Sequence, residues 1–190
     1  MRSRGLDGIT FVDLCADYPR HDIDVEKEQR RLLDHDVILF QFPFYWYSTP
    51  SLLKEWQDLV LQHGFAYGHD GDKLAGKTLM LAPTAGGSNE AYTPNGYQHY
   101  PVRSFLTPLE QTARLCRMGF TTPYVLYAAL KADAVAEIEK HANGCARLVT
   151  AIRDDDYDFA AAEAFDVVTS DDVPKLAKAT TESLEKHDVA

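Results

Sequence analysis

Apolar residues follow two different periods along this chain. Near-continuous apolar runs at 37–42 and 78–82 are typical of strands that helices bury on both faces. At 25–35 and 51–63, apolar residues instead recur every three or four positions, which predicts amphipathic helices. Because the two kinds of segment alternate, the pattern predicts βαβ units, and therefore an α/β fold with a parallel sheet and helices on both of its faces.

The remaining pattern completes one domain and adds a tail. We expect further strands at 9–14 and 123–128, and helices at 101–118 and 133–152, the second of which could break at its Asn143-Gly144 pair. Beyond an acidic break at 154–156, the tail holds a short apolar run at 165–168 and a last helix at 173–187. We therefore assign the domain to 1–153, and a partly helical C-terminal extension to 154–190.

The composition narrows the range of partners. The 190 residues are 45% hydrophobic, enough for a sizeable core, and carry a formal net charge of −10. Such an acidic surface repels nucleic acid and anionic membrane surfaces. No apolar run reaches the roughly 20 residues that span a bilayer, and residues 1–8 lack the apolar core of a signal peptide. Three cysteines without a CxxC pair or metal-ligand spacing predict reduced thiols, a cytoplasmic protein and no metal site.

Two loops at the ends of predicted strands hold the candidate chemistry. Phe42-Pro43-Phe44-Tyr45-Trp46-Tyr47-Ser48 ends the first buried run, and Thr84-Ala85-Gly86-Gly87 follows the second. The carboxyl ends of neighbouring parallel strands meet at one edge of a sheet, where ligands bind. Aromatic side chains offer a flat wall and glycines let the backbone approach a planar ring, which favours a flavin site. A hydrophobic plug and an ordinary turn explain the same residues about equally well.

The same residues belong to a longer ordered series. It runs from FQFPFYWYS at 40–48 through PSLLKEW at 50–56, GFAYG at 64–68 and GK at 76–77 to TAGG at 84–87, with DID at 22–24 and EQ at 28–29 upstream. Over about residues 9–150 this series resembles the NAD(P)H dehydrogenase (quinone) flavoproteins. The nearest likeness is to the ancillary oxidoreductases of the glutathione-gated potassium efflux system and to the modulator-of-drug-activity type. The resemblance implies a flavodoxin-like fold, a homodimer, and two-electron ping-pong reduction of quinones by NAD(P)H through FMN, with FAD as the other flavin to consider.

Carried over by position, the resemblance assigns roles to single residues. The cofactor-binding residues would be Pro43, Phe44, Tyr45, Trp46, Tyr47, Thr84, Ala85, Gly86, Gly87 and, near N1 and O2 of the flavin, Tyr92. Phe65 and Tyr67 would bind the quinone in the partner subunit's site. The catalytic residues would be Tyr92, Tyr67 and His99, the last next to Gln98, which stands where some members have a histidine. The sequence is equally consistent with Tyr92 and His99 being solvated loop residues that have no role in catalysis. Ala85 replaces a threonine of the family.

One part of the family's pattern does not occur in this sequence. Members begin with a strand and a His-Pro and Ser/Asn loop that grips the FMN phosphate at a helix N-terminus. Here 1–7 resembles the end of that first helix, and 9–14 the second strand. In the flavodoxin strand order 2-1-3-4-5 the first strand is internal, so the strands at 9–14 and 37–42 would have facing, unpaired edges. Three accounts stay open: a true start upstream of Met1, which we expect, a fragment, or 165–168 filling the gap.

Other functions stay open besides the enzyme. A flavin-poor regulatory or binding subunit would contact a potassium-efflux membrane protein, as the resemblance implies. A dimeric scaffold or a non-functional fragment would bind no ligand.

Overall fold

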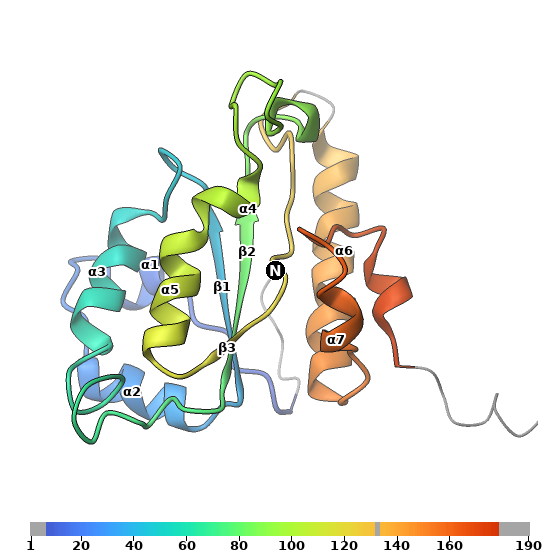
Figure 1. Cartoon of the computed structure of the whole chain (residues 1–190). Helices are drawn as coiled ribbons and strands as arrows, with labels where there is room; N and C mark the ends of the chain where they lie inside the picture. Colours follow the sequence, from blue (N-terminus) through green and yellow to red (C-terminus); the bar gives the residue numbers. More distant parts are fainter. Residues whose placement is uncertain (1–6, 132–133, 179–190) are drawn as a thin grey trace, which may run out of the picture.

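A computed structural model describes residues 7–131 and 134–178 (Figure 1). Three strands form a parallel sheet in the order β1-β2-β3: β1 is Val37–Pro43, β2 is Thr78–Thr84 and β3 is Gly119–Phe120. β1 and β2 pair along their whole length, from Val37 opposite Thr78 to Pro43 opposite Thr84. Beyond β3 the chain stays extended, and isolated parallel bridges join Thr84 to Leu126 and Tyr124 to Val168. The α/β class and the two apolar strands are therefore confirmed.

Helices cover both faces of this sheet. α3 (Ser51–Val60), α4 (Val102–Phe105) and α5 (Thr107–Leu115) lie on one side, and α6 (Ala134–Arg153) lies on the other (Figure 1). The remaining elements are α1 (Leu14–Asp17), α2 (Val25–Leu33), η1 (Asn89–Ala91), α7 (Phe159–Ala162) and η2 (Val173–Leu176). Within the described ranges, no helix has both the length and the apolar character needed to span a membrane.

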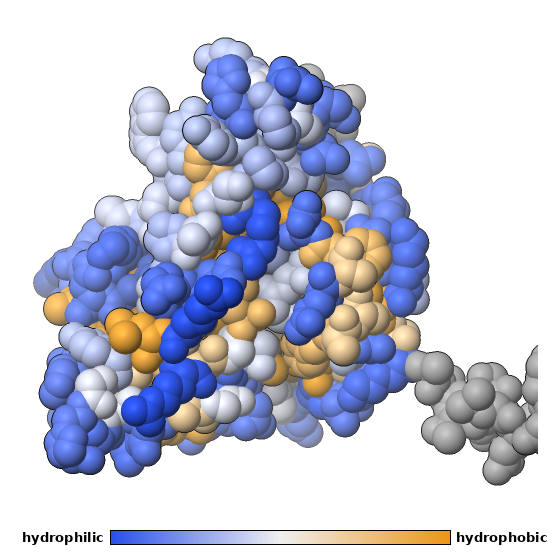
Figure 2. All heavy atoms as spheres, in the orientation of Figure 1, coloured by the Kyte–Doolittle hydropathy of each residue, from blue (hydrophilic) through white to orange (hydrophobic). Residues whose placement is uncertain are grey.

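The core consists of two apolar clusters on opposite faces of the sheet. Phe42, Leu79 and Leu81 pack with α3 and α5 in one cluster, whereas Met80 and Ala82 pack with α6 in the other. This division follows from the alternation of side chains along β2. Residues of the C-terminal extension belong to the second cluster, with Tyr157, Val168 and Leu176 almost fully buried. Figure 2 shows that polar residues cover most of the viewed face, while apolar residues gather over α7. The described part of the extension thus shares its core with β2.

A buried carboxylate joins the first three helices. Glu28 is 3% exposed and accepts hydrogen bonds from the Tyr18 hydroxyl (2.6 Å), an Arg31 nitrogen (2.6 Å) and the Trp56 indole (3.0 Å). Asp24 caps α2 by accepting from the amide of Lys27. Burial and the Glu28 carboxylate raise the pKa of Tyr18, so its hydroxyl remains a donor at neutral pH. This network fixes α2 against α3.

One predicted strand is absent, and one of the three accounts of the missing first strand is removed. Residues 9–13 pair with no strand of the described part of the chain, and Leu14 begins α1 instead. A strand-like composition alone does not make a strand, because a ladder needs a partner edge in register; the side chains of Thr10 and His35 share a hydrogen bond of 2.8 Å just before β1. The run 165–168 does not lie beside β1 either. Val168 pairs with Tyr124, at the opposite edge of the sheet.

The helix predictions need smaller corrections. Helix 101–118 is divided at Leu106 into α4 and α5. α6 continues through Asn143 and Gly144 without a break. Gly144 is buried where the Tyr124 hydroxyl and Ser170 leave no room for a side chain, which accounts for a glycine inside the helix. Of the predicted helix at 173–187, the structure has the single turn η2, and residues 179–187 lie outside the described residues.

Candidate functional site

The loop after β1 is a tight turn that presents an aromatic side chain. Tyr45 and Ser48 exchange two main-chain hydrogen bonds, of 3.1 and 2.9 Å. The central residues, Trp46 and Tyr47, have φ angles of 49° and 64°. Turns of this type prefer Asn-Gly, and left-handed φ in bulky residues costs on the order of 1–3 kcal/mol each. Strained residues of this kind cluster at functional sites. In this turn the side chain of Trp46 is 92% exposed.

The loop after β2 lies directly beside this turn. The amide of Phe44 donates to the carbonyl of Thr84, which continues the ladder past the strands (2.9 Å). Ala85 is fully buried and its amide donates to Leu126 (2.7 Å), while Gly86 is exposed and Gly87 half-buried. Pro43 and Thr84 are partners in the register. The structure therefore brings together the predicted cofactor residues of 43–47 and 84–87.

Four main-chain donors at this edge are free. Among the described residues, the amides of Trp46, Tyr47, Gly86 and Gly87 donate to no backbone or side-chain acceptor. Exposed N–H groups held on two adjacent tight loops can donate to the heteroatoms of a planar ligand without displacing internal bonds.

A third loop, 127–131, completes the edge, and it was not among the predicted site residues. The amide of Ala128 donates to Gly87 and that of Ala129 to Ala85, at 2.8 and 3.0 Å. A side chain built at Gly86 would meet Leu130, at 2.9 Å from its Cδ1. The sequence did contain a signal for this loop, because it follows the predicted strand at 123–128 and parallel strands end at one edge.

Tyr92 lies in an aromatic cluster that we define as Phe44, Tyr47, Tyr92, Tyr100, Phe105 and Tyr127. Its ring centroid lies 6.4 Å from that of Phe44, 6.3 Å from Phe105 and 6.0 Å from Tyr127. Tyr92 is 6% exposed, so it is not a solvated loop residue. Burial raises the pKa of Tyr92 and raises that of Tyr127 to about 12. Both phenols therefore keep their protons at neutral pH and can act as donors.

His99 lies at the rim of this cluster. It is exposed and has a φ of 61°, and its neighbour Tyr100 packs on Phe105 with 5.9 Å between centroids. The main-chain amide of Gln98 donates to the carbonyl of Ala91 at the start of the same loop (2.9 Å). Tyr92 and His99 thus belong to one folded loop, with the phenol inside and the imidazole in solvent.

Phe65 and Tyr67 lie elsewhere. They belong to the connection between the C-terminus of α3 and the start of β2, which places them at the amino edge of the sheet (Figure 1). Tyr67 is 36% exposed and its ring packs edge-on against His63. Trp46 and Gly86 lie at the carboxyl edge, so one chain does not bring Tyr67 to them.

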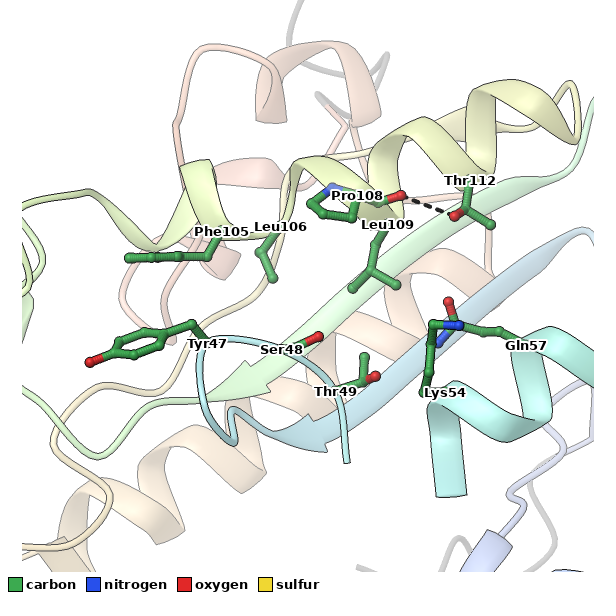
Figure 3. A pocket seen from close by; sticks show the side chains of 10 residues that line it. All are labelled: Tyr47, Ser48, Thr49, Lys54, Gln57, Phe105, Leu106, Pro108, Leu109 and Thr112. Carbon is green, nitrogen blue, oxygen red and sulfur yellow. Dashed lines mark hydrogen bonds between the residues drawn. The ribbon is translucent and has the colours of Figure 1, made fainter. Parts of the chain in front are cut away.

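A small cavity adjoins the aromatic turn. Its volume is about 120 Å³, and it lies between the 47–49 segment, α3 and the helices α4 and α5. Figure 3 shows Phe105, Leu106 and Leu109 facing Tyr47 and Thr49, with Lys54 and Gln57 from α3 at the other end. Gln57 is buried and donates to Leu53. No predicted site residue except Tyr47 lines this cavity. No cluster of potential metal ligands occurs in the described ranges.

The parallel sheet, with its loops gathered at the carboxyl edge, defines a class of α/β ligand-binding proteins. Residues 2–149 match the family described as having a flavodoxin-like fold, and the chain belongs to that family.

Two curated relatives carry more specific names. The glutathione-regulated potassium-efflux system ancillary protein KefG of Cronobacter sakazakii is 46% identical over 136 residues, 72% of this chain and 73% of the relative. The uncharacterized NAD(P)H oxidoreductase YrkL of Bacillus subtilis is 47% identical over 122 residues, 64% of this chain and 70% of the relative.

Two solved structures share the fold. General stress protein 14 of Treponema denticola, in complex with FMN, is 36% identical with a TM-score of 0.64, and the match covers 68% of this chain and 72% of that one. A structure described as a thermophilic tryptophan halogenase from Streptomycin violaceusniger is 46% identical with a TM-score of 0.67, covering 70% and 78%.

Proposed function

We propose that this chain is an FMN-dependent NAD(P)H oxidoreductase that reduces quinones by two-electron, ping-pong hydride transfer. The observation that carries the proposal is the set of four free main-chain donors, on Trp46, Tyr47, Gly86 and Gly87, beside an exposed indole. The polar edge of an isoalloxazine ring needs such donors, and its plane needs an apolar wall. An FMN complex of a relative that is 36% identical supports the same assignment.

In this proposal bound FMN would be the two-electron carrier between NAD(P)H and the quinone. The chain's own residues orient the ring and hold protons. Pro43, Phe44 and Tyr45 would shape the wall with Trp46, while Thr84 and Ala85 would position the glycine donors. The Tyr92 phenol, kept protonated by burial, would donate a hydrogen bond near the ring, and the exposed His99 would exchange protons with water. The net reaction consumes one NAD(P)H, one quinone and one proton.

The first experiment is to add FMN to the purified protein. We expect flavin absorbance near about 450 nm to remain with the protein after gel filtration, and NADH or NADPH to bleach it. Addition of benzoquinone should then restore the colour. Protein that stays colourless at saturating FMN would rule out the enzyme.

Gly86→Val tests the site directly. We expect this change to abolish flavin binding. Because the new side chain would also meet Leu130, the matched control is Leu130→Ala, alone and combined with Gly86→Val. If the double variant recovered wild-type FMN affinity, the lost binding would come from the displaced loop and not from the ring's position.

The homodimer is part of the proposal, since Tyr67 and Phe65 lie at the amino edge of their own sheet. In a dimer they would reach the quinone bound in the partner's site. Tyr67→Ala should then lower quinone turnover more than FMN binding. Mixing Tyr67→Ala with Gly86→Val protein should restore activity, because a heterodimer holds one complete site. Failure of the mixture, with heterodimers shown to form, would contradict this arrangement.

A second candidate function is that of a flavin-poor binding subunit in the cytoplasm. The likeness to KefG, named as an ancillary protein of a potassium-efflux system, favours it. The partner would then be the cytoplasmic part of a potassium-efflux membrane protein. Pull-down of that domain by colourless protein would support this candidate over the enzyme.

A further inference from the structure

The cavity beside the turn after β1 ends in a buried polar group that lacks a donor. Gln57 on α3 lines this cavity and is 7% exposed. Its Nε2 donates to the carbonyl of Leu53 (3.0 Å), which fixes Oε1 as the other end of the carboxamide. Figure 3 shows this carboxamide reaching from α3 toward Leu109 and Thr112 on α5. Among the described residues nothing donates to Oε1. A buried acceptor without a donor is unfavourable, so this end of the cavity suits a ligand that carries a donor.

The neighbouring polar groups do not fill this need. The Lys54 ammonium pairs with both carboxylate oxygens of Asp58 in solvent, at 2.5 and 2.6 Å. The hydroxyl of Thr112 donates to the carbonyl of Pro108 (3.0 Å, Figure 3), so its oxygen can only accept from a ligand. The inner end therefore presents acceptors. An anionic ligand would face these oxygens and a chain of net charge −10, which leaves a neutral donor as the matching chemistry.

The rest of the wall is apolar and has room for one ring. It is formed by Phe105, Leu106, Pro108 and Leu109, and Leu106 is 1% exposed. The volume of about 120 Å³ is close to the roughly 150 Å³ of an apolar cavity that holds one benzene molecule. A single six-membered ring is therefore the largest rigid body that fits.

We propose that this cavity binds one neutral aromatic ring that carries a hydroxyl group, as in a phenol or a benzenediol. The O–H group donates to Gln57 Oε1, and the ring packs against Leu106 and Leu109. This site is distinct from the flavin edge and shares only Tyr47 with the predicted cofactor residues. Tyr47 stacks on Phe105 with 5.1 Å between ring centroids, so a ring bound here contacts a residue that also carries one of the four free main-chain donors.

The ligand class includes the product of the proposed reaction, since two-electron reduction of benzoquinone yields benzene-1,4-diol. Its second hydroxyl would lie near Ser48 and Thr49, which line the same cavity. This link to the product rests on the proposed function, whereas the binding of a phenol does not.

Methyl NMR of the full chain without added flavin tests the proposal. The probe is phenol, and the matched control is toluene, in which a methyl group of similar size replaces the hydroxyl. We expect phenol to shift the methyl signals of Leu106 and Leu109 saturably, with a Kd on the order of 1 mM. Phenol should bind at least as tightly as toluene, although toluene is the more apolar ring. The signals of Leu148, in the other cluster, should not move.

Two results would overturn the proposal. One is the absence of a saturable shift at about ten times that concentration, which would mean that the cavity takes water only. The other is a shift confined to Leu130, which would place the ring at the carboxyl edge instead.

A variant pair tests the hydrogen bond. Gln57→Leu removes the acceptor and keeps the size of the side chain, and the control is Gln111→Leu, at an exposed position of α5 outside the cavity. The affinity for phenol relative to toluene should fall at least about tenfold in Gln57→Leu and stay unchanged in Gln111→Leu. An unchanged ratio in a Gln57→Leu protein with the circular dichroism spectrum of the wild type would contradict the proposal.

Benzene-1,4-diol, kept reduced under nitrogen, distinguishes the two sources of the ligand. Tighter binding than that of phenol would support the product of the proposed enzyme as the ligand. Weaker binding would support a simple phenol from elsewhere. Because no flavin is added, these results do not depend on whether the chain binds FMN.

Discussion

Gly144 in the middle of α6 sets two physical effects against each other. By helix propensity, Gly144→Ala should stabilise the protein by about 0.5–1 kcal/mol. The added Cβ, however, would overlap the hydroxyl of Tyr124 and lie 2.9 Å from Ser170 Cβ. That hydroxyl donates to the carbonyl of His141 at 2.8 Å, and the two rings stack at 4.3 Å.

The clash should exceed the gain in propensity. Overpacking a closed core costs about 1–3 kcal/mol, and displacing the Tyr124 hydroxyl leaves a buried carbonyl unpaired, for about 1–3 kcal/mol more. After the propensity gain is subtracted, we expect Gly144→Ala to lower the free energy of unfolding by about 1–5 kcal/mol. Urea denaturation followed by circular dichroism measures this change.

Two matched variants separate the causes. Asn143→Ala, at an exposed position of the same helix, should shift stability by no more than about 0.5 kcal/mol. In a Tyr124→Phe background the overlapping oxygen is gone, so Gly144→Ala should cost at least about 1 kcal/mol less than in the wild type. A Gly144→Ala protein as stable as the wild type would refute the reasoning. So would a cost that the Tyr124→Phe background does not change.

Three further changes test other parts of the structure. Glu28→Gln should destabilise by about 1–3 kcal/mol in urea denaturation, because the buried indole N–H of Trp56 would then face an amide donor; Trp56→Phe should cost less in the Gln background than alone. Burial lowers the pKa of His141 to about 4, below its ordinary 6.5, so the contribution of this residue to stability should be full above pH 6.5 and fall as the pH drops toward 4. His141→Phe should remove that part of the acid sensitivity. If the unfolding free energy of the variant differed between pH 7 and pH 4.5 by as much as that of the wild type, this cause would be contradicted. In a Trp56→Phe protein the exposed Trp46 is the remaining indole, and added FMN should quench its fluorescence strongly; weaker quenching than in Trp46→Phe would argue against the site.

Local pattern was sufficient where one segment carried its own signal. The apolar runs of β1 and β2 and the amphipathic α2 and α3 are all present where periodicity predicted them. Parallel pairing then follows from the helical connections, and it brings the 43–47 and 84–87 loops to one edge. The sequence by itself therefore determined the fold class and the contact between these two loops.

Other features depended on neighbours that the sequence does not specify. Residues 9–13 have the composition of a strand, but a strand exists only where a second edge accepts its hydrogen bonds. Val168 pairs with Tyr124, and both side chains belong to the apolar cluster that packs with α6. Gly144 resembled a helix break, and only the position of the Tyr124 hydroxyl shows that it is a close contact within a helix.

The candidate site divides in the same way. The residue types predicted an aromatic and glycine-rich edge. Three loops packed together produce the features that the sequence did not predict: the strained turn at Trp46, the burial of Tyr92 and the contact of Leu130 with Gly86. The separation of Tyr67 from Trp46 is likewise decided by the path of α3 from one edge of the sheet to the other. Periodicity records which face of a segment is apolar. Only tertiary packing decides which main-chain groups stay unpaired, and those groups define the site.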